Sequence, residues 1–509
     1  MLDVMPTRGV YCEFNEQDNT LEIGIKEQGE SNKDTIVDAL SKEENKENRR
    51  HTTKIIIKDN IIAPPDCSYL FSPFSNSCPE FKESSEYPYK IREVDEDKPA
   101  QEKDCLETIE GLEKLDTCST TNMNSMFWNC NNLKQVDLSN LKTSNVSDMG
   151  SMFSMCHSLK KADLASFNTE NVTNMSRMFK KCFNLNHIDL GGFSTKKVTD
   201  MCKMFWFCRS LTSLTFPESF YTYNVTDMNS MFSRCSSISK LDLSMFDTSN
   251  VTDMSWMFYD LPNVESLELE NFDTSKVTNM RRMFTACCNL NYLNLSNFDT
   301  KNVTDMGLMF ASCSSIKKFD LLGFNTVKVE DMSRMFQGCK ALTELDLSGF
   351  STQMTTTMES MFEDCVKLYD LKFRKVLLVK GLWDGKEKYD EPLVFVSSSF
   401  VADNVTNLKS MFKNCAGLEY LDLSDFSVNA VTEMDSMFEN CINLFRVKLP
   451  NLSVDKRVNE KSKISMSRMF SCCSSLATLD LTPLDTSNVT DMVGMFDGCP
   501  APRPSWYRE

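Results

Sequence analysis

The sequence is poor in the residues on which common enzyme sites depend. It contains three histidines, His51, His157 and His187, and none lies in a catalytic-triad or metal-binding spacing. The motifs G-x-G-x-x-G and H-E-x-x-H and the P-loop do not occur. Glycine and proline are scarce, at 16 and 15 of 509 residues, which excludes a collagen-like or low-complexity chain. The sequence predicts a packed protein that is not an enzyme and holds no cofactor or metal.

Positive charge and long apolar runs are lacking as well. The formal net charge of −17 disfavours nucleic acid, because neutralising phosphates needs a basic surface, and it disfavours adsorption to anionic membranes. No 18 apolar residues run together, so no transmembrane helix is predicted. The N-terminal stretch MLDVMPTRGVYCEF shows no signal-peptide core and no lipoprotein signal before Cys12. We therefore expect protein partners and no direct membrane span.

What the sequence does contain is a repeat. Met-Phe pairs recur every 26 residues, with single intervals of 27, 50 and 32. A fixed period of this length indicates a solenoid, in which each repeat packs against its neighbours. The pairs begin at Met126, Met152, Met178, Met204, Met231, Met257, Met283, Met309, Met335, Met361, Met411, Met437, Met469 and Met495.

Each repeat predicts a strand, a turn and a short helix. The phrase L-x-x-L-D-L-S alternates apolar and polar residues, which is typical of a strand with one buried face. In the following phrase, N-V-T-D-M-x-x-M-F-x-x-C, the apolar residues are spaced by three, three, one and three. This spacing favours a short helix with its apolar residues on one side. We therefore predict an α/β repeat solenoid, leucine-rich-repeat-like, with about 14 rungs and a small irregular N-terminal region.

The phrase LDLSxFDTSNVTDMSxMFxxC resembles the repeat of the BspA-like leucine-rich-repeat surface proteins, a bacterial family. The resemblance covers about residues 106–500, and IEGLEKLDTCSTTNMNSMF is similar to the family's entry half-rung. It implies a solenoid displayed at a cell surface or secreted, used for adhesion or protein recognition. The alternative is an intracellular, cytoplasmic scaffold that binds proteins through the same faces, which reduced buried thiols and the lack of a visible export signal favour.

The repeat places cysteine three residues after thirteen of the fourteen Met-Phe pairs. Zinc needs ligands that converge on one point, and a linear column does not supply them. We expect small buried thiols that fill the space between layers, with metal or redox chemistry as the other reading.

A second column is acidic and lies between the two apolar residues of each predicted strand, where alternation points it to solvent. Two readings stay open: hydrogen bonds and ion pairs within the sheet, or weak binding of a cation or a basic partner. The column consists of Asp137, Asp163, Asp189, Asp242, Glu268, Asp320, Asp346, Asp422 and Asp480.

Aromatic residues replace polar ones beside several Met-Phe pairs. The repeat period predicts that those of two nearby rungs lie within roughly 10 Å of each other. They are candidate partner-binding anchors, or they are covered by the N-terminal segment, or they are scattered exposed residues. The candidates are Trp128, Trp206, Phe207, Trp256 and Tyr259.

The domain plan has three parts. Residues 1–105 form an N-terminal region that is partly disordered, with a charged linker at 26–50. Residues 106–500 form the solenoid, with a β-hairpin insertion at about 374–400, where two apolar runs flank an Asp-Gly pair. Residues 501–509 form a proline-rich C-terminal cap or tail.

Overall fold

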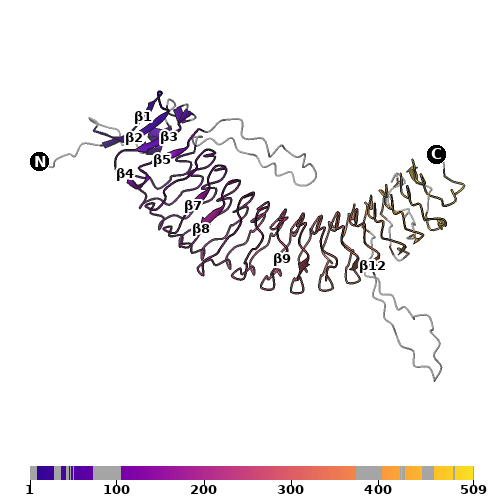
Figure 1. The fold of residues 1–509 in the computed structure, drawn as a ribbon. Helices are drawn as coiled ribbons and strands as arrows, with labels where there is room; N and C mark the ends of the chain where they lie inside the picture. The colour runs from indigo at the N-terminus through magenta and orange to yellow at the C-terminus, as the bar shows by residue number, and fades with distance from the viewer. Residues whose placement is uncertain are drawn as a thin grey trace, which may run out of the picture. The chain divides into compact units, whose positions relative to one another are not determined.

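The computed structural model describes residues 8–27, 36–41, 45, 48–49, 51–72, 105–373, 404–424, 426, 430–449, 464–484 and 488–507. The predicted hairpin at about 374–400 lies outside these residues. The chain divides into two compact units, residues 1–246 and 247–509, and successive repeats lie side by side in each (Figure 1). In the described part of the chain, no helix is long and apolar enough to cross a membrane.

The first unit begins with a four-stranded sheet (Figure 1). β1 (Arg8–Asn15) and β2 (Thr20–Glu27) form an antiparallel hairpin. β3 (Lys54–Ile57) pairs in parallel with β2 and with β5 (Thr108–Glu110). The described strands of this region therefore form a regular sheet, unlike the irregular region that the sequence predicted.

Helix α1 (Ile36–Ser41) lies within the predicted charged linker at 26–50. Its residues Ile36, Ala39 and Leu40 are buried, so the expectation of a disordered or exposed linker does not hold for α1. Three apolar residues within six are enough for one buried helical side, even in a segment that is charged on average.

One rung precedes the first Met-Phe pair. The N–H groups of Cys67, Tyr69 and Phe71 donate to the carbonyls of the rung that contains Met126, at 2.8 to 3.2 Å. The Phe71 ring stacks on Phe127 with 5.4 Å between centroids. β4 (Ile61–Ile62) pairs in parallel with β6 (Leu115–Asp116), which follows the 3-10 helix η1 (Leu112–Lys114). Residues 54–72 are thus a rung that the Met-Phe spacing does not reveal.

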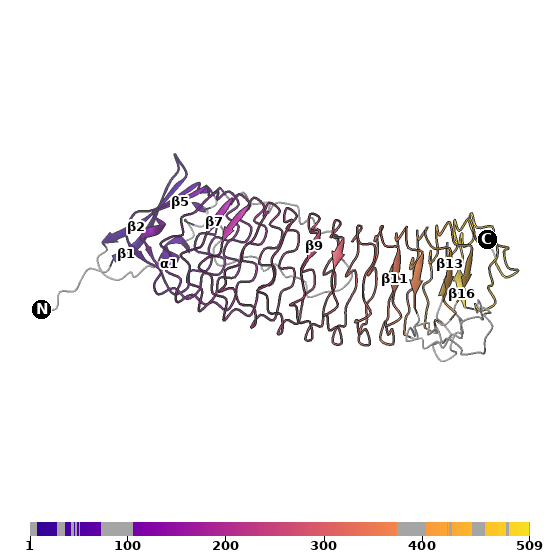
Figure 2. The same ribbon diagram turned by 60° about the horizontal axis from the view of Figure 1, so that its bottom comes forward.

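Short parallel strands occur where the L-x-x-L-D-L-S phrase predicts them. In the first unit β7 (Lys161–Asp163) pairs with β8 (His187–Asp189). In the second unit the pairs are β9 (Ser266–Leu267) with β10 (Tyr292–Leu293), β11 (Glu344–Asp346) with β12 (Asp370–Lys372), and β13 (Tyr420–Asp422) with β14 (Arg446–Lys448). β9, β11 and β13 lie on one side of that unit (Figure 2).

A second parallel ladder, here named the bridge column, passes through the fourth residue of the N-V-T-D-M phrase. It pairs Asn122 with Asp148 and Asp148 with Asn174 in the first unit, and Asp305 with Asp331 in the second. Near the C-terminus the ladder includes β15 (Ile464–Ser465) and β16 (Val489–Asp491). The rungs of β7 and β8, for example, are tied at two points, by the β7–β8 pair and by the bridge between Asn174 and Asp200.

The predicted short helix after the bridge column is wrong for the described repeats, and the α/β class is not supported. The segment folds as consecutive tight turns, with Ser125 and Asn129 in the left-handed region at φ 57° and 63°. The Met126 N–H closes a turn onto Met123, whereas the Phe127 N–H donates to the carbonyl of Met152 in the next rung. A helix would keep all its hydrogen bonds inside one rung, whereas this alternation lets every rung bind its neighbour.

The core is built from columns of identical residues. Phe127, Phe153, Phe179 and Phe205 are fully buried, and their rings stack 5.2 to 5.8 Å apart and nearly parallel. Burying each ring stabilises the fold by about 2 to 3 kcal/mol. Since each rung supplies one ring, removal of one leaves a gap between two neighbours.

Candidate functional site

The predicted aromatic residues fall into both units. Trp128, Trp206, Trp256 and Tyr259 are half-buried. Trp206 and Phe207 belong to the first unit, and Trp256 and Tyr259 to the second. The expected proximity of the two pairs therefore stays a prediction. Within the second unit, Trp256 contacts Tyr259 at 4.7 Å between centroids and carries the Arg282 guanidinium over its ring at 4.3 Å.

Among the candidate anchors Phe207 is buried, with only 5% of its surface accessible. It precedes the column cysteine, where the backbone takes the left-handed conformation at φ 68°. The guanidinium groups of Arg209 and Arg234 lie over its ring, 4.1 and 4.8 Å from the centroid. Two cations from adjacent rungs therefore cover the ring.

The consecutive tight turns that follow the bridge column form one surface of each unit, here called the turn surface. A basic–aromatic patch surrounds Phe207 on the turn surface of the first unit. The Lys180 and Lys181 ammonium groups lie 5.0 and 5.3 Å from the centroid of Trp206, which stacks on Phe207 at 5.6 Å. We define the patch as Lys180, Lys181, Trp206, Phe207, Arg209 and Arg234. Aligning the repeats by column would have found its cations in the sequence.

The patch creates a positive field at its edge. His157 stacks on Phe183 at 4.4 Å, and Phe183 also lies beneath Arg209. Burial, together with the smaller effect of the charges of Lys181 and Arg209, lowers the pKa of His157 to about 4. The histidine is therefore neutral at pH 7, and the charge of this surface comes from lysine and arginine.

Turn hydrogen bonds engage most members of the acidic sheet column. Seven of its members are exposed, and Asp346 and Asp422 are half-buried. Asp137 and Asp480 accept the N–H of the residue two positions on, at 3.0 and 2.9 Å, and Asp346 does the same at 2.9 Å. Hydroxyl and N–H donors from Ser139 lower the pKa of Asp137, and those from Thr482 lower the pKa of Asp480. An aspartate that begins a turn needs no cation to account for it.

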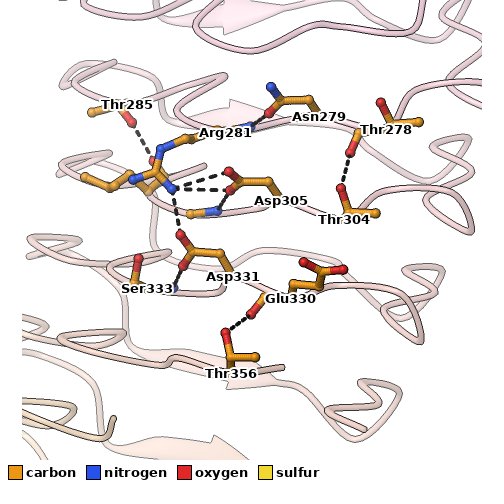
Figure 3. A network of polar contacts seen from close by, with 12 residues as sticks. Thr278, Asn279, Arg281, Thr285, Thr304, Asp305, Glu330, Asp331, Ser333 and Thr356 are labelled. Atoms are coloured by element: carbon orange, nitrogen blue, oxygen red, sulfur yellow. Dashed lines mark hydrogen bonds and ion pairs between the residues drawn. The ribbon is translucent and has the colours of Figure 1, made fainter. Parts of the chain in front are cut away.

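In the second unit the bridge column carries two adjacent carboxylates with a cation between them (Figure 3). Arg281 Nη1 lies 3.3 Å from Asp305 Oδ1 and 2.7 Å from Asp331 Oδ2. Burial raises the pKa of Asp305, and Arg281 opposes that rise. A Cβ atom on Gly307 would collide with Arg281 Nη1, so this glycine makes the room that the guanidinium occupies.

The first unit also carries two adjacent carboxylates, with other residue types at the neighbouring positions. Asp200 and Asp227 are adjacent in its bridge column, and the ligand atoms of Asp200, Cys202 and Asp227 all lie within 4.8 Å of one another. Cys202 stands where the second unit has Gly307, and Ser176 where it has Arg281. Burial raises the pKa of Cys202 to about 12, so the thiol keeps its proton at neutral pH.

The cysteine column forms a ladder of hydrogen bonds between rungs. Cys156 Sγ donates to the Phe127 carbonyl at 3.1 Å, and Cys182 Sγ to the Phe153 carbonyl at 3.1 Å. Twelve of the thirteen column cysteines are buried, and Leu261 fills the same place in the remaining rung. Burial raises the pKa of the thiols, to about 12 for Cys235, Cys287, Cys339 and Cys441. The ladder is structural, because protonated buried thiols are unreactive.

Comparison with known families identifies the repeat. Residues 100–213, 184–268, 262–372, 367–463 and 464–502 match the family described as a Mycoplasma protein of unknown function, DUF285. The matches cover more than half of the chain, so the chain belongs to this family. No curated protein matches it.

The chain also resembles several solved structures. A leucine-rich repeat protein from Eubacterium ventriosum is 14% identical, with 98% of this chain and 95% of that chain covered and a TM-score of 0.32. The functional domain of InlJ from Listeria monocytogenes, which includes a cysteine ladder, is 14% identical over 66% of each chain, with a TM-score of 0.22. TLR13 in complex with ssRNA13 is 14% identical, with 89% of this chain covered and a TM-score of 0.25; the chain spans about half the length (51%) of that TLR13 chain.

Proposed function

We propose that this protein is a non-enzymatic, protein-binding solenoid that acts in surface adhesion or recognition, in the manner of the BspA-like proteins. The observation that carries the proposal is the turn surface, where half-buried tryptophans occupy positions that most repeats give to polar residues. Tryptophan and arginine are the residues that most often dominate protein interfaces. Membership of a repeat family supports the proposal, because stacked repeats offer an extended surface and no single convergent catalytic cluster.

The test is partner capture by the full chain from a native extract of the source cells, followed by calorimetry with the purified partner. We expect the double variant Trp206→Ala, Trp256→Ala to weaken binding by about tenfold or more without changing the melting temperature. Tyr292→Ala is the matched control, because Tyr292 is 57% exposed on the strand side of the second unit. Equal binding by the double variant, or a large loss of stability, would remove the aromatic residues from the proposal.

An intracellular scaffold is the second candidate, and the cysteines favour it. All twenty cysteines in the described part of the chain are free thiols, which suits a reducing compartment. Labelling intact cells with a membrane-impermeant biotin reagent separates the two candidates. We expect labelling if the protein is displayed at the surface, and a chain labelled only after lysis would establish the scaffold instead.

A further inference from the structure

Three consecutive rungs of the first unit carry an excess of positive charge on their turn surface. The ten-residue turn segments that start at the bridge column are 174–183, 200–209 and 227–236. They contain six basic residues, Arg177, Lys180, Lys181, Lys203, Arg209 and Arg234, and two acidic ones, Asp200 and Asp227. Rungs stand about 4.8 Å apart, so basic residues on neighbouring rungs concentrate positive charge on this surface.

The rings beneath the cations hold several of them in place. Arg209 and Arg234 stack on Phe207, and Lys180 and Lys181 lie over Trp206. A guanidinium stacked on a ring directs its N–H donors along its own plane, the geometry in which arginine binds a carboxylate with two hydrogen bonds. The patch is therefore preorganised for an anion.

The two acidic residues of these rungs lie at the bridge column. Asp200 accepts the N–H of Cys202 at 2.9 Å, and Asp227 accepts the N–H of Asn229 at 2.8 Å. Both are half-buried. Of the six basic residues, Arg209 is exposed and the other five are half-buried. Six basic and two acidic groups leave four net positive charges on the three segments, in a chain whose net charge is −17.

We propose that the basic–aromatic patch binds a carboxylate-rich segment of a protein partner. This proposal rests on the proposed function and adds the chemistry of the partner. Three rungs span about 10 Å, and alternate side chains of an extended peptide lie about 7 Å apart, so two or three carboxylates match the cations. Nucleic acid fits less well, because a long polyanion would meet the negative field of the rest of the chain.

The test uses the full chain and a short fluorescein-labelled peptide of alternating glutamate and serine, measured by fluorescence anisotropy. We expect binding that weakens as salt rises and that falls about tenfold or more in the double variant Arg209→Glu, Arg234→Glu. Lys340→Glu is the matched control, because Lys340 occupies the rung position of Arg209 in the second unit and is exposed. Its binding should equal that of the unchanged chain.

Several results would overturn the assignment. Peptide binding that is absent, or that survives the double variant, excludes the patch as its site. Tighter binding of a single-stranded oligonucleotide than of the peptide would assign the patch to nucleic acid. If the double variant does not fold, as judged by circular dichroism, Lys180→Gln with Lys181→Gln replaces it and should weaken peptide binding several-fold.

The same variants separate this inference from the proposed function. A captured partner that binds Arg209→Glu, Arg234→Glu normally would contradict the acidic-segment inference and leave the protein-binding proposal intact. Peptide binding at the patch by a chain that captures no protein would instead contradict the protein-binding proposal.

Discussion

The turn surface of residues 174–236 in the first unit and that of residues 331–442 in the second place charge in opposite ways. The first carries basic residues on three consecutive rungs. In the second the sign alternates: segment 357–366 holds three acidic residues, 407–416 two basic ones and 433–442 three acidic ones. Ion pairs join its neighbouring rungs, Arg334 with Glu359 at 2.6 Å and Lys413 with Glu439 at 2.8 Å. One backbone thus supports either internal neutralisation or an accumulated charge.

The difference follows from the fixed register of the rungs. Each turn position stands beside the same position of the next rung, so a change of sign from rung to rung creates a pair, whereas repetition of a sign creates a strip. Exposed pairs contribute at most about 1 kcal/mol each, so alternation is a modest stabiliser. The strip in the first unit gathers net positive charge instead, which is why we assign it to binding.

The largest effect that we expect is a loss of stability at alkaline pH, and both units should show it. The ordinary thiol pKa is 9.0, and burial raises it to about 12 for Cys235 in the first unit and Cys287 in the second. Between these values the unfolded state binds fewer protons than the folded state, so stability is complete below pH 9 and falls as pH rises. Urea unfolding followed by circular dichroism at pH 7, 9 and 10.5 measures this fall.

Tyrosine and lysine titrate over the same range, so a variant isolates the thiols. Cys235→Ala removes one titrating group from the ladder and should reduce the dependence of stability on pH above pH 9. An unchanged alkaline slope in Cys235→Ala would show that the buried thiols do not cause it.

The next largest effect concerns the stability that the Arg281 ion pairs contribute at the bridge column. Arg281→Met leaves Asp305 and Asp331 facing each other and should destabilise the second unit by about 2 to 3 kcal/mol, because Arg281 and Asp331 are each only 15% exposed. Arg334→Met is the control: it breaks a more exposed pair and should cost at most about 1 kcal/mol. Hydrogen exchange read by mass spectrometry gives the stability of each peptide. Equal effects of the two variants would contradict the account.

The smallest effect that we expect separates the two surfaces directly. Added salt screens repulsion in residues 174–236 and attraction in residues 331–442. Raising sodium chloride from about 0.05 to about 0.5 M should increase protection from hydrogen exchange in the first and decrease it in the second, by about 0.5 kcal/mol each. Changes in protection of the same sign in both regions would contradict this account of their charges.

The sequence predicts the repeat and its strands but not the path between them. The L-x-x-L-D-L-S phrase locates β7, β8 and β11, because alternation of burial is a local property of a strand. The N-V-T-D-M-x-x-M-F-x-x-C phrase misled, because its apolar spacing fits a helix as well as two successive turns. Hydrogen bonds such as that from Phe127 to Met152 decide between the two, and they join residues in different rungs.

The candidate site was predicted in part. Trp206 and Trp256 are half-buried on the turn surface, whereas Phe207 is buried beneath Arg209 and Arg234. The prediction singled out the rings and overlooked the cations, because lysine and arginine are ordinary at surface positions of any single repeat. Only their neighbours in adjacent rungs make them a patch. The rung at residues 54–72 was missed because Asp66–Phe71 keeps the Asp and Phe of the phrase but not its Met-Phe pair.

The sequence by itself determined the period, the repeat family and the identity of every column, since these depend only on which residues recur at 26-residue intervals. The tertiary structure alone decided the turns in place of helices, the thiol ladder and the clustering of the cations over two rings. These features are contacts between rungs, and residues that touch there are about one full repeat apart in the chain. The sequence of one repeat specifies which residue occupies each position. The stacking of repeats specifies which residues each position contacts.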